Sequence, residues 1–364
     1  MTESALADLG TRVGPVLIFL VAITVVAEIT DAAGVFDVAG HWAARAGRGR
    51  TWLLWLLIVG LSCLSTIVLR LDTTAVLLTP VVIAVARQLR LNPLPFAMTT
   101  VWLANTASLL LPVSNLTNLL ALHRFSDLGL GHSGYVSLAV WPALAAIGAT
   151  VVVLALIHLS DLRGRYSTNA PPAPHDRTLL VVAGSVCVAL GPAFAIGITP
   201  AIAASAAALV LVDTCLIRNR PLLRAVKVPW LIVVGVCVLF IAVDVALSHG
   251  LRDLLANWVG TGTGTTDLLR VSAVGAGSSN AVDNLPAYLA PESVTDNDPR
   301  RLMALLIGVN IGPLVTIWAS LATILWRDRC RRAGVTISVW RFAWQGALCA
   351  SAATVAAVLA LSFA

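Results

Sequence analysis

The sequence predicts an all-α protein that crosses a membrane several times and is built from two inverted repeats. Hydrophobic residues make up 58% of its 364 positions and charged residues only 12%, about half the charged share of soluble chains. Several apolar runs approach the ~20 residues that a membrane-spanning helix needs. Polar and helix-breaking residues interrupt corresponding runs in both halves. We therefore expect a re-entrant hairpin and a broken transmembrane helix in each repeat.

The first repeat is expected to cover residues 1–159. It begins with a retained helix rather than a cleaved signal peptide, because Glu28 and Asp31 follow the first apolar run where a small-residue cleavage site would stand. Within this repeat we expect a re-entrant hairpin over 51–90 and a broken helix over 96–121.

The second repeat is expected to cover residues 230–364, with a hairpin over 268–292 and a broken helix over 302–326. Between the repeats, the Pro-, Asn- and Ser-rich segment 160–177 is typical of a linker. Residues 178–229 are expected to form a connecting helix pair. The other expected spans cover 14–34, 136–158, 178–196, 200–217, 230–248 and 341–362.

Arginine-rich loops predict the orientation of the chain. When the expected elements are threaded through a membrane, most of the 24 Lys and Arg residues fall on one face, which marks the cytoplasm. This predicts a multi-pass protein of the cell inner (plasma) membrane, with a cytoplasmic linker and both termini extracytoplasmic. The net charge of +6 thus reflects topology, and we expect no nucleic-acid partner.

Three sequence blocks repeat weakly in the same order. The repeats run in opposite directions across the membrane, an arrangement typical of secondary transporters. The paired blocks are 27–42 with 243–258, LDTTAVLLTP (71–80) with DNLPAYLAPE (283–292), and ANTASLLLPVSNLTNLLA (104–121) with VNIGPLVTIWASLATILW (309–326).

The breaks in these helices carry amide and hydroxyl side chains beside proline and glycine. An unwound backbone inside a membrane is tolerated only where it is buried in protein or lines a wet cavity. Such side chains can also simply join helices by hydrogen bonds, but asparagine clusters repeated in both halves favour a binding site. The predicted substrate-binding residues are Asn105, Ser114, Asn115, Thr117, Asn118, Asn280, Asn284, Asn310, Ser320 and Thr323.

Two carboxylates at the hairpin turns are the predicted proton- or ion-coupling residues. A carboxylate at membrane depth is expensive and by default functional, which makes Asp72 the main candidate and Asp283 the second. Arg70 is close enough in sequence to be a structural ion partner of Asp72.

Other chemistries find little support. The six cysteines show no metal-binding or disulfide spacing, so neither a metal nor a cofactor is expected. HExxH, P-loop and intramembrane-protease aspartate motifs are missing from the sequence. An enzyme is therefore not expected, and an intramembrane enzyme is only a remote alternative.

Several stretches together resemble a known family. The runs GVFDVAGHWAARAGRGR, LDTTAVLLTPVVIA, VDNLPAYLA and NIGPLVTIWASLATILW, with the TASLLLPVSNLTN block, are similar to the arsenite efflux permeases of the ArsB type. These permeases belong to the ion transporter superfamily, and the resemblance covers roughly residues 20–362. It implies an elevator-like exchange of a central site and export of As(III) or Sb(III). It also implies that protons or an attached cytoplasmic ATPase subunit drive the export.

Several positions depart from the family pattern. Asp72 matches the family's hairpin aspartate, but Leu71 and Thr73 replace the Asn and Gly that flank it in the family. Asn105 and Asn310 stand where the family usually has aspartate, and Leu314 stands where it has lysine. As(OH)3 is neutral near pH 7, so amides and hydroxyls can bind it without a fixed counter-charge. Asp72 would then carry the proton, protonated in one orientation and ionised in the other.

The departures leave other cargoes open. A carrier of dicarboxylates or other organic anions and a sodium/proton antiporter of the same superfamily are the alternatives. The expected partners are As(III) or Sb(III), protons and the lipid bilayer, and we also consider a homodimer.

Overall fold

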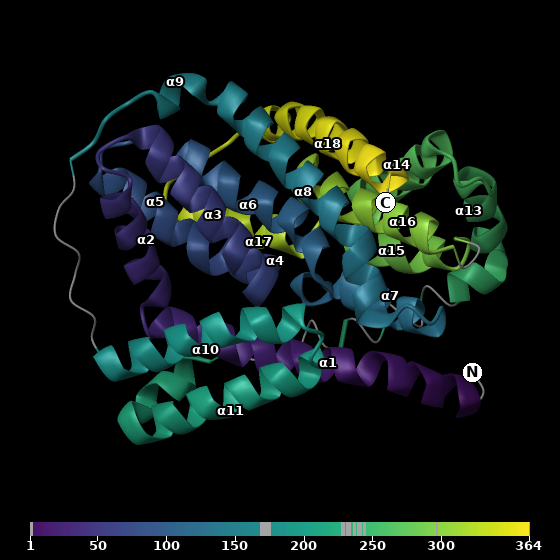
Figure 1. The fold of residues 1–364 in the computed structure, drawn as a ribbon, viewed down its shortest axis with the longest axis horizontal. Coiled ribbons are helices and arrows are strands. Elements are labelled where there is room, and N and C mark those ends of the chain that lie inside the picture. The colour runs from purple at the N-terminus through teal and green to yellow at the C-terminus, as the bar shows by residue number, and fades with distance from the viewer. Residues whose placement is uncertain are drawn as a thin grey trace. The chain divides into compact units, whose positions relative to one another are not determined.

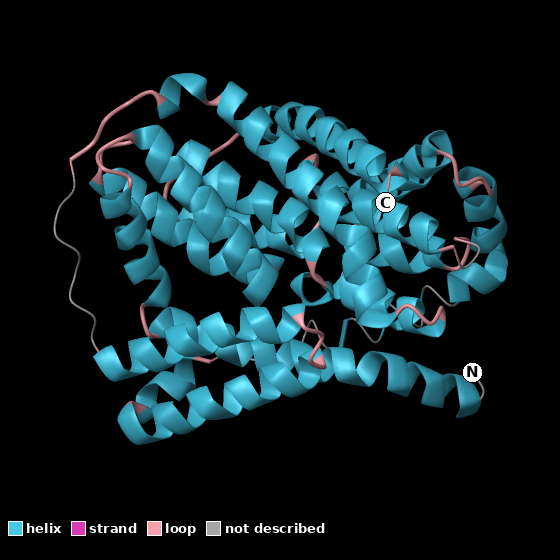
Figure 2. Ribbon diagram, in the orientation of Figure 1, coloured by secondary structure: helices cyan, strands magenta, loops and turns pink. Residues whose placement is uncertain are grey.

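The computed structural model describes residues 3–167, 176–226, 245–295 and 298–363, together with 230, 234, 235, 238 and 242. Across this part of the chain the secondary structure is helical (Figure 2), apart from one isolated bridge between Arg50 and Arg165. The prediction of an all-α polytopic membrane protein is confirmed. That the repeats are inverted stays a prediction, as do the repeat boundaries. Residues 168–175 of the linker 160–177 and about half of the predicted span 230–248 lie outside the described residues.

The chain forms two compact units, labelled by element in Figure 1. The first contains residues 1–41 and 169–239. In it, α1 (Glu3–Ala32) packs against α10 (Arg177–Ala195) and α11 (Pro200–Arg218), and the 3-10 helix η4 (Arg220–Ala225) follows. Phe19 of α1 meets Phe194 of α10 edge to face, with ring centroids 6.1 Å apart.

The second unit contains residues 42–168 and 240–364. α2 (Val35–Ala46) leads into it from α1. Its elements are α3 (Thr51–Leu69), α4 (Leu71–Thr73), the π-helix η1 (Thr74–Leu78), α5 (Thr79–Gln88), α6 (Leu94–Ala107), the 3-10 helices η2 (Ser108–Leu110) and η3 (Pro112–Ser114), α7 (Leu116–Asp127), α8 (Gly131–Ile157), α9 (Leu159–Leu162), the π-helix η5 (Leu247–Leu251), α13 (Arg252–Val259), α14 (Thr265–Val282), α15 (Asn284–Glu292), α16 (Pro299–Ile311), the 3-10 helix η6 (Gly312–Leu314), α17 (Leu321–Arg332) and α18 (Val339–Ser362).

Several of these helices can cross a membrane. Among the described residues, six are long and apolar enough, and a bent pair, Leu17–Ala32 with Val35–Ala46, makes a seventh. The pair bends by 57° at Gly34, whose φ of 80° lies in a region that glycine adopts at little cost. The broken helices are composed of shorter pieces, so they are not counted among the six.

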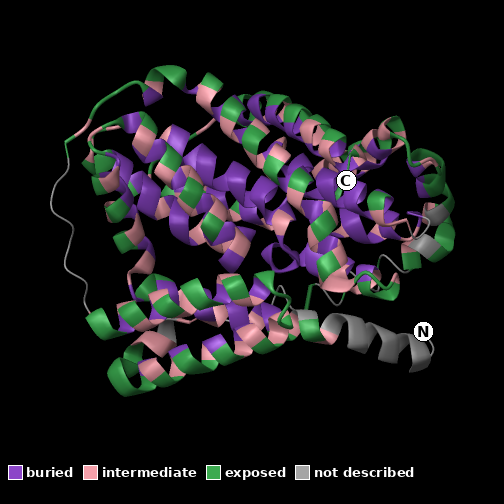
Figure 3. Ribbon diagram, in the orientation of Figure 1, coloured by how far each residue is buried: buried purple, intermediate pink, exposed green. Residues whose placement is uncertain are grey.

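The interior of the second unit depends on close helix pairs (Figure 3). α8 packs along α18, and α14 packs along α16. A Cβ added to Gly308 would lie 2.1 Å from the carbonyl oxygen of Ser272, and one added to Gly346 would lie 1.8 Å from that of Leu314. Helix backbones therefore approach so closely here that only glycine fits without a shift.

In each predicted hairpin interval, the turn between two helices is made by a non-glycine residue with positive φ. α3 ends at Arg70 (φ 85°), and α14 ends at Asp283 (φ 126°). Such backbone is costly for a residue with a side chain, and it persists where the surroundings enforce it. By their place after α3 and α14, Arg70 and Asp283 are the corresponding turn residues. The sequence blocks instead pair Leu71 with Asp283, which is a shift of one position.

Arginine-rich segments meet at one end of the second unit. Arg50 bridges to Arg165, and Asn92 donates a 3.0 Å hydrogen bond to Asp161, which joins the α5–α6 loop to α9. A Cβ on Gly334 would lie 3.4 Å from the guanidinium of Arg87. These contacts gather the ends of α3, α5, α8 and α17 at one end of the unit, hereafter the basic end.

Candidate functional site

The first broken helix is interrupted by a proline in its middle. α6 gives way to η2, and Leu111 is extended (φ −120°, ψ 146°), as residues before proline tend to be. Pro112 has no N–H to continue the helical bonding. Asn115 is again extended, and its side-chain oxygen caps α7 by accepting from the Thr117 N–H at 3.4 Å. The break leaves the N-terminus of α7 in the protein interior.

The second broken helix has the same plan. α16 ends at Ile311, η6 follows with Pro313, and α17 starts after Ser320. Ser320 is extended and its hydroxyl oxygen accepts from the Thr323 N–H at 3.2 Å. Ser320 thus caps α17 as Asn115 caps α7, which supports the predicted correspondence of the two blocks.

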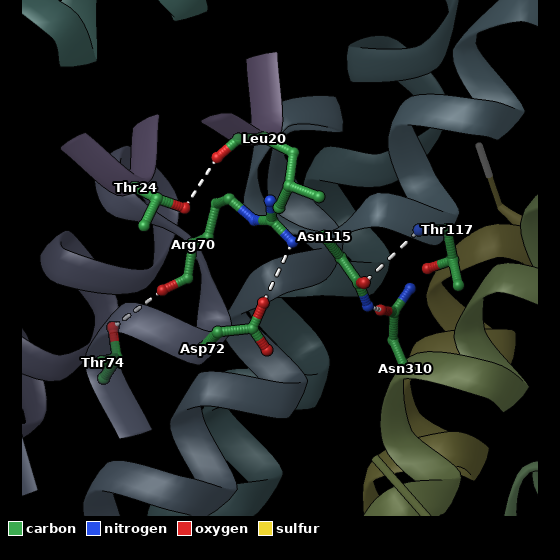
Figure 4. Close-up of polar contacts among 8 residues, drawn as sticks. All are labelled: Leu20, Thr24, Arg70, Asp72, Thr74, Asn115, Thr117 and Asn310. Carbon is green, nitrogen blue, oxygen red and sulfur yellow. Dashed lines mark hydrogen bonds and ion pairs between the residues drawn. The ribbon is translucent and has the colours of Figure 1, made fainter. Parts of the chain in front are cut away.

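Asn310 joins the two broken helices. Its side-chain oxygen accepts hydrogen bonds from the amide of Asn115 and from the hydroxyl of Ser108, the latter at 3.1 Å. Its Nδ2 donates to the side-chain oxygen of Asn118 at 2.7 Å and to the carbonyl of Leu306 at 2.9 Å. Figure 4 shows Asn310 facing Asn115 across the two segments. The three asparagines and Ser108 form one buried cluster, which we call the asparagine cluster.

The bonds of the cluster fix its amide orientations. The Asn115 oxygen is engaged by Thr117, so its Nδ2 points to Asn310. The Asn118 Nδ2 donates to the Ser108 carbonyl at 2.7 Å, so its oxygen faces Asn310. The three amides are therefore oriented consistently, and the single hydroxyl proton of Ser108 is shared between the Asn105 carbonyl and the Asn310 side-chain oxygen.

Asn105 lies one turn before the cluster. Its Nδ2 donates to the Val101 carbonyl at 2.9 Å, just as Asn310 donates to Leu306 four residues before it. The Asn105 carbonyl accepts from the Ser108 hydroxyl at 2.7 Å. Its side-chain oxygen is buried and has no hydrogen-bond partner among the described residues.

The second hairpin supports the second break. The Asn280 oxygen accepts from both the N–H and the hydroxyl of Thr316 at 2.9 Å, and its Nδ2 donates to the Gly312 carbonyl at 2.8 Å. Asp283 caps α15 by accepting from the Leu285 N–H at 3.1 Å. Asn284 lies beside it, buried at the start of α15. Asn280 therefore holds the unwound backbone rather than the asparagine cluster.

The first hairpin turn holds an ion pair. Arg70 donates to Asp72 at 3.0 Å, with the arginine side chain 6% exposed and the aspartate 27% exposed. Thr74 donates to Ser65 at 2.9 Å and accepts from Thr66 at 3.0 Å. Asp72 is thus engaged by the partner that the sequence indicated. It also lies close enough to Asp283 to interact electrostatically, so the two hairpin turns face a common region.

The remaining predicted residues lie on either side of the cluster. Ser114 donates to the Ile67 carbonyl at 3.1 Å, which ties the first break to the first hairpin. Thr117 donates to Asn118 at 3.4 Å. Ser320 and Thr323 share a 2.9 Å hydrogen bond at the start of α17, which packs on α4 and η1. Within the described chain, these two make no hydrogen bond to the asparagine cluster.

Two features were missed among the predicted site residues. Ser108 is a member of the cluster, and its place in the first polar break was the available signal. Glu292 is 5% exposed; it accepts from the Tyr288 hydroxyl at 2.9 Å and pairs with Arg124 at 3.6 Å. A lone carboxylate in the otherwise apolar YLAPES stretch was the signal for this link between α15 and α7.

The comparison with known families decides the class of protein. Residues 9–297 match the family model described as citrate transporter. The chain belongs to the citrate transporter family. It is a membrane transporter and not an enzyme.

Proteins similar in sequence to this member of the citrate transporter family include arsenical pump membrane proteins. Arsenical pump membrane proteins of Escherichia coli and Yersinia enterocolitica are each 29% identical, over 351 and 353 residues, which is 87% of this chain and 79% of theirs. An uncharacterized transporter of Mycobacterium tuberculosis is 26% identical over 355 residues, 92% of this chain and 82% of its own. The resemblance to the ArsB-type permeases is confirmed.

Proposed function

We propose that the chain exports trivalent arsenic and antimony, as neutral hydroxides, by antiport against protons. The single observation that carries this proposal is the asparagine cluster. Amides from the two broken helices meet at Asn310 in a buried place without a fixed charge. The arsenical pump relatives support the cargo.

The chemistry of the cargo fits such a site. As(OH)3 offers three hydroxyls that both donate and accept, and amide side chains do the same. Its hydroxyls would replace the Asn115–Asn310 and Asn118–Asn310 bonds, and the unpaired oxygen of Asn105 would accept one more. The interior N-termini of α7 and α17 add the positive ends of two helix dipoles. Ser320 and Thr323 line the start of α17 and would contact the cargo from that side.

Asp72 is the proposed proton carrier. Its carboxylate is partly exposed and paired with Arg70. When the site changes its access from one side of the membrane to the other, a proton would bind Asp72 in place of the ion pair with Arg70. Asp283, on the second hairpin turn and within electrostatic reach, is the second proposed coupling residue. The two hairpins and two broken helices would move together in an elevator-like step, as inverted repeats allow.

Transport into everted vesicles tests the proposal. As(III) uptake is measured with and without a pH gradient for the wild type, Asp72→Asn and a matched control, Asp253→Asn, which changes an exposed carboxylate on α13. We expect gradient-dependent uptake in the wild type and the control, and loss of the gradient dependence in Asp72→Asn. Gradient-dependent uptake that survives in Asp72→Asn would remove Asp72 as the carrier. The absence of As(III) uptake in a folded wild type would remove arsenite as cargo.

An organic anion is the second candidate cargo. The family description as citrate transporter favours it, and so do the N-termini of α7 and α17, because helix N-termini attract carboxylates. Labelled citrate and a sodium gradient in the same vesicles separate this alternative from arsenite export and from sodium/proton exchange.

We also propose an orientation and location. The basic end of the second unit would face the cytoplasm of a cell whose inner membrane holds the protein. Both termini would then lie on the other side. A cytoplasmic ATPase subunit or a second copy of the chain would be further partners.

A further inference from the structure

A small pocket lies at the basic end of the second unit, away from the asparagine cluster. It has a volume of ≈240 Å³ and lies where α3 begins and α8 passes into α9. Its walls are Trp52, Trp55, Leu56, Ala155 and Leu159, and Arg163 stands at its edge as the charged member of the lining. The pocket therefore has an apolar lining with one charged residue, Arg163.

Uncompensated positive charge surrounds this pocket. Arg45, Arg48, Arg50, Arg163 and Arg165 are all exposed. None of the five pairs with a carboxylate within the described part of the chain. The bridge between Arg50 and Arg165 brings two of these cations together beside Arg163. Such a group of exposed like charges attracts anions, because the potentials of its members add.

The loop that presents Arg163 is held rigidly. The Thr51 N–H donates to the Gly164 carbonyl at 3.1 Å, and the Tyr166 N–H donates to the Gly49 carbonyl at 3.0 Å. The Tyr166 hydroxyl donates to the Ala44 carbonyl at 2.7 Å. The backbone that carries Arg163 is therefore fixed before any ligand arrives, which lowers the entropy cost of binding.

We also expect the pocket to lie at the membrane surface. α3 is one of the helices able to cross the membrane, and the pocket lies at its first turn. Trp52 in that turn is 46% exposed, and exposed tryptophan is typical of the boundary between headgroups and hydrocarbon. A ligand here has its apolar part in the bilayer and its polar part in the headgroup layer.

We propose that this pocket, which we call the lipid pocket, binds an anionic glycerophospholipid. A segment of one acyl chain fills the apolar walls, and the phosphate accepts hydrogen bonds from Arg163 with Arg50 and Arg165 nearby. A zwitterionic lipid offers the same acyl chain but no net charge to compensate the arginines. The complementary charge thus selects an anionic headgroup, as in basic pockets of other membrane proteins.

Native mass spectrometry of the purified full chain tests this proposal. The protein in mild detergent is titrated with phosphatidylglycerol and, separately, with phosphatidylethanolamine of the same acyl chains. We expect tighter binding of phosphatidylglycerol. Arg163→Gln should weaken it about fivefold, the factor that one arginine beside an anionic headgroup supplies. Arg331→Gln, which removes an exposed cation of α17 that is not part of the pocket lining, should leave it unchanged.

A second pair of variants tests the apolar half without changing any charge. Ala155→Phe fills the pocket and should abolish the preference. Val152→Phe adds the same ring on an exposed face of α8 outside the lining and should keep it. Equal affinity for the two lipids, equal weakening by Arg163→Gln and Arg331→Gln, or unchanged preference in Ala155→Phe would each overturn the proposal. Preferential capture of a soluble acidic protein at this surface, with no lipid preference, would also overturn it.

Discussion

At the scale of single residues, Asn310 stands out because its side chain makes four hydrogen bonds. One buried side chain accepts from Asn115 and Ser108 and donates to Asn118 and Leu306. Each partner is itself buried, so none can turn to water when Asn310 is lost. The family aspartate expected at this position would carry a charge into the same place, whereas the amide both donates and accepts and leaves the cluster neutral.

Replacing Asn310 should therefore destabilise the fold as well as transport. Asn310→Ala removes the hydrogen-bond partner of the buried Asn115 amide and one bond each from Ser108 and Asn118, and we expect a loss of about 1–3 kcal/mol in the free energy of unfolding. Chemical denaturation in detergent, followed by circular dichroism, measures it. Asn257→Ala is the matched control, because that exposed side chain on α13 makes no hydrogen bond to the described residues. Equal stability of the two variants would show that the asparagine cluster does not hold the broken helices together.

The hairpin turn residues show what a sequence can and cannot disclose. Asp72 and Asp283 are recognisable because carboxylates in an apolar chain stand out. The left-handed backbone at Arg70 and Asp283 is not recognisable, since the sequence places no glycine there. Only the packing of the surrounding helices enforces it, and this explains why the sequence blocks align these turns one residue out of register.

At the scale of elements, close helix packing in the second half depends on small residues. Gly308 of α16 lies against the backbone of Ser272 on α14, where a Cβ would approach the carbonyl oxygen to 2.1 Å. Gly277 of α14 is also helical, but a Cβ there would meet nothing within 4 Å. The two glycines thus form a natural pair for comparison.

We expect opposite effects from alanine at these two positions. Gly308→Ala must push α16 from α14 and should lower the free energy of unfolding by about 1–3 kcal/mol. Gly277→Ala should raise it by about 0.5–1 kcal/mol, because alanine favours the helix over glycine. Thermal unfolding of both variants in the same detergent measures the difference. A Gly308→Ala protein as stable as the wild type would contradict the close approach of α14 and α16.

The start of α10 makes a prediction about pH. Hydrogen bonds from the Leu179 and Thr178 N–H groups, together with Arg218, lower the pKa of Asp176 below its ordinary value. The folded state thus favours the carboxylate. Its contribution to stability is present above the unfolded pKa of about 4 and is lost as pH falls through the lower folded pKa.

The variant Asp176→Asn checks this contribution. Asparagine can still cap the helix, but it lacks the charge that favours the helix N-terminus and Arg218. We expect the wild type to unfold at a higher temperature than the variant at about pH 6, and the gap to shrink as pH falls below about 4. A gap that stays constant over this range would mean that the charge of Asp176 adds nothing.

Helix ends were predictable where local chemistry sets them. The expected spans 178–196 and 200–217 correspond to α10 and α11 because Asp176 caps the first and Pro200 starts the second. Partners far apart in the sequence were not predictable. Nothing local indicates that Asn310 bonds to Asn118, 192 positions away, or that the Trp326 indole donates to the Ala97 carbonyl at 2.8 Å. Such contacts arise only when the two halves fold together.

At the scale of the whole molecule, the arginine-rich segments predict the orientation. Cations from distant parts of the sequence gather at the basic end of the second unit, and positively charged ends stay in the cytoplasm. α8 and α18 pack along each other, and Arg341 at the start of α18 lies near His158 at the end of α8. The two helices are therefore antiparallel, and the end of α18 lies opposite the basic end.

Reporter fusions test this orientation on the full chain. Alkaline phosphatase, which is active only after export, is fused after Ala364 or inserted in the loop after Gly334. We expect activity from the terminal fusion and none from the loop insertion, because positive charge holds the Gly334 loop inside. Green fluorescent protein, which fluoresces only inside, should give the inverse result at each site and serves as the control for expression. Fluorescence from the terminal fusion with a silent phosphatase would place the basic end outside and contradict the proposed orientation.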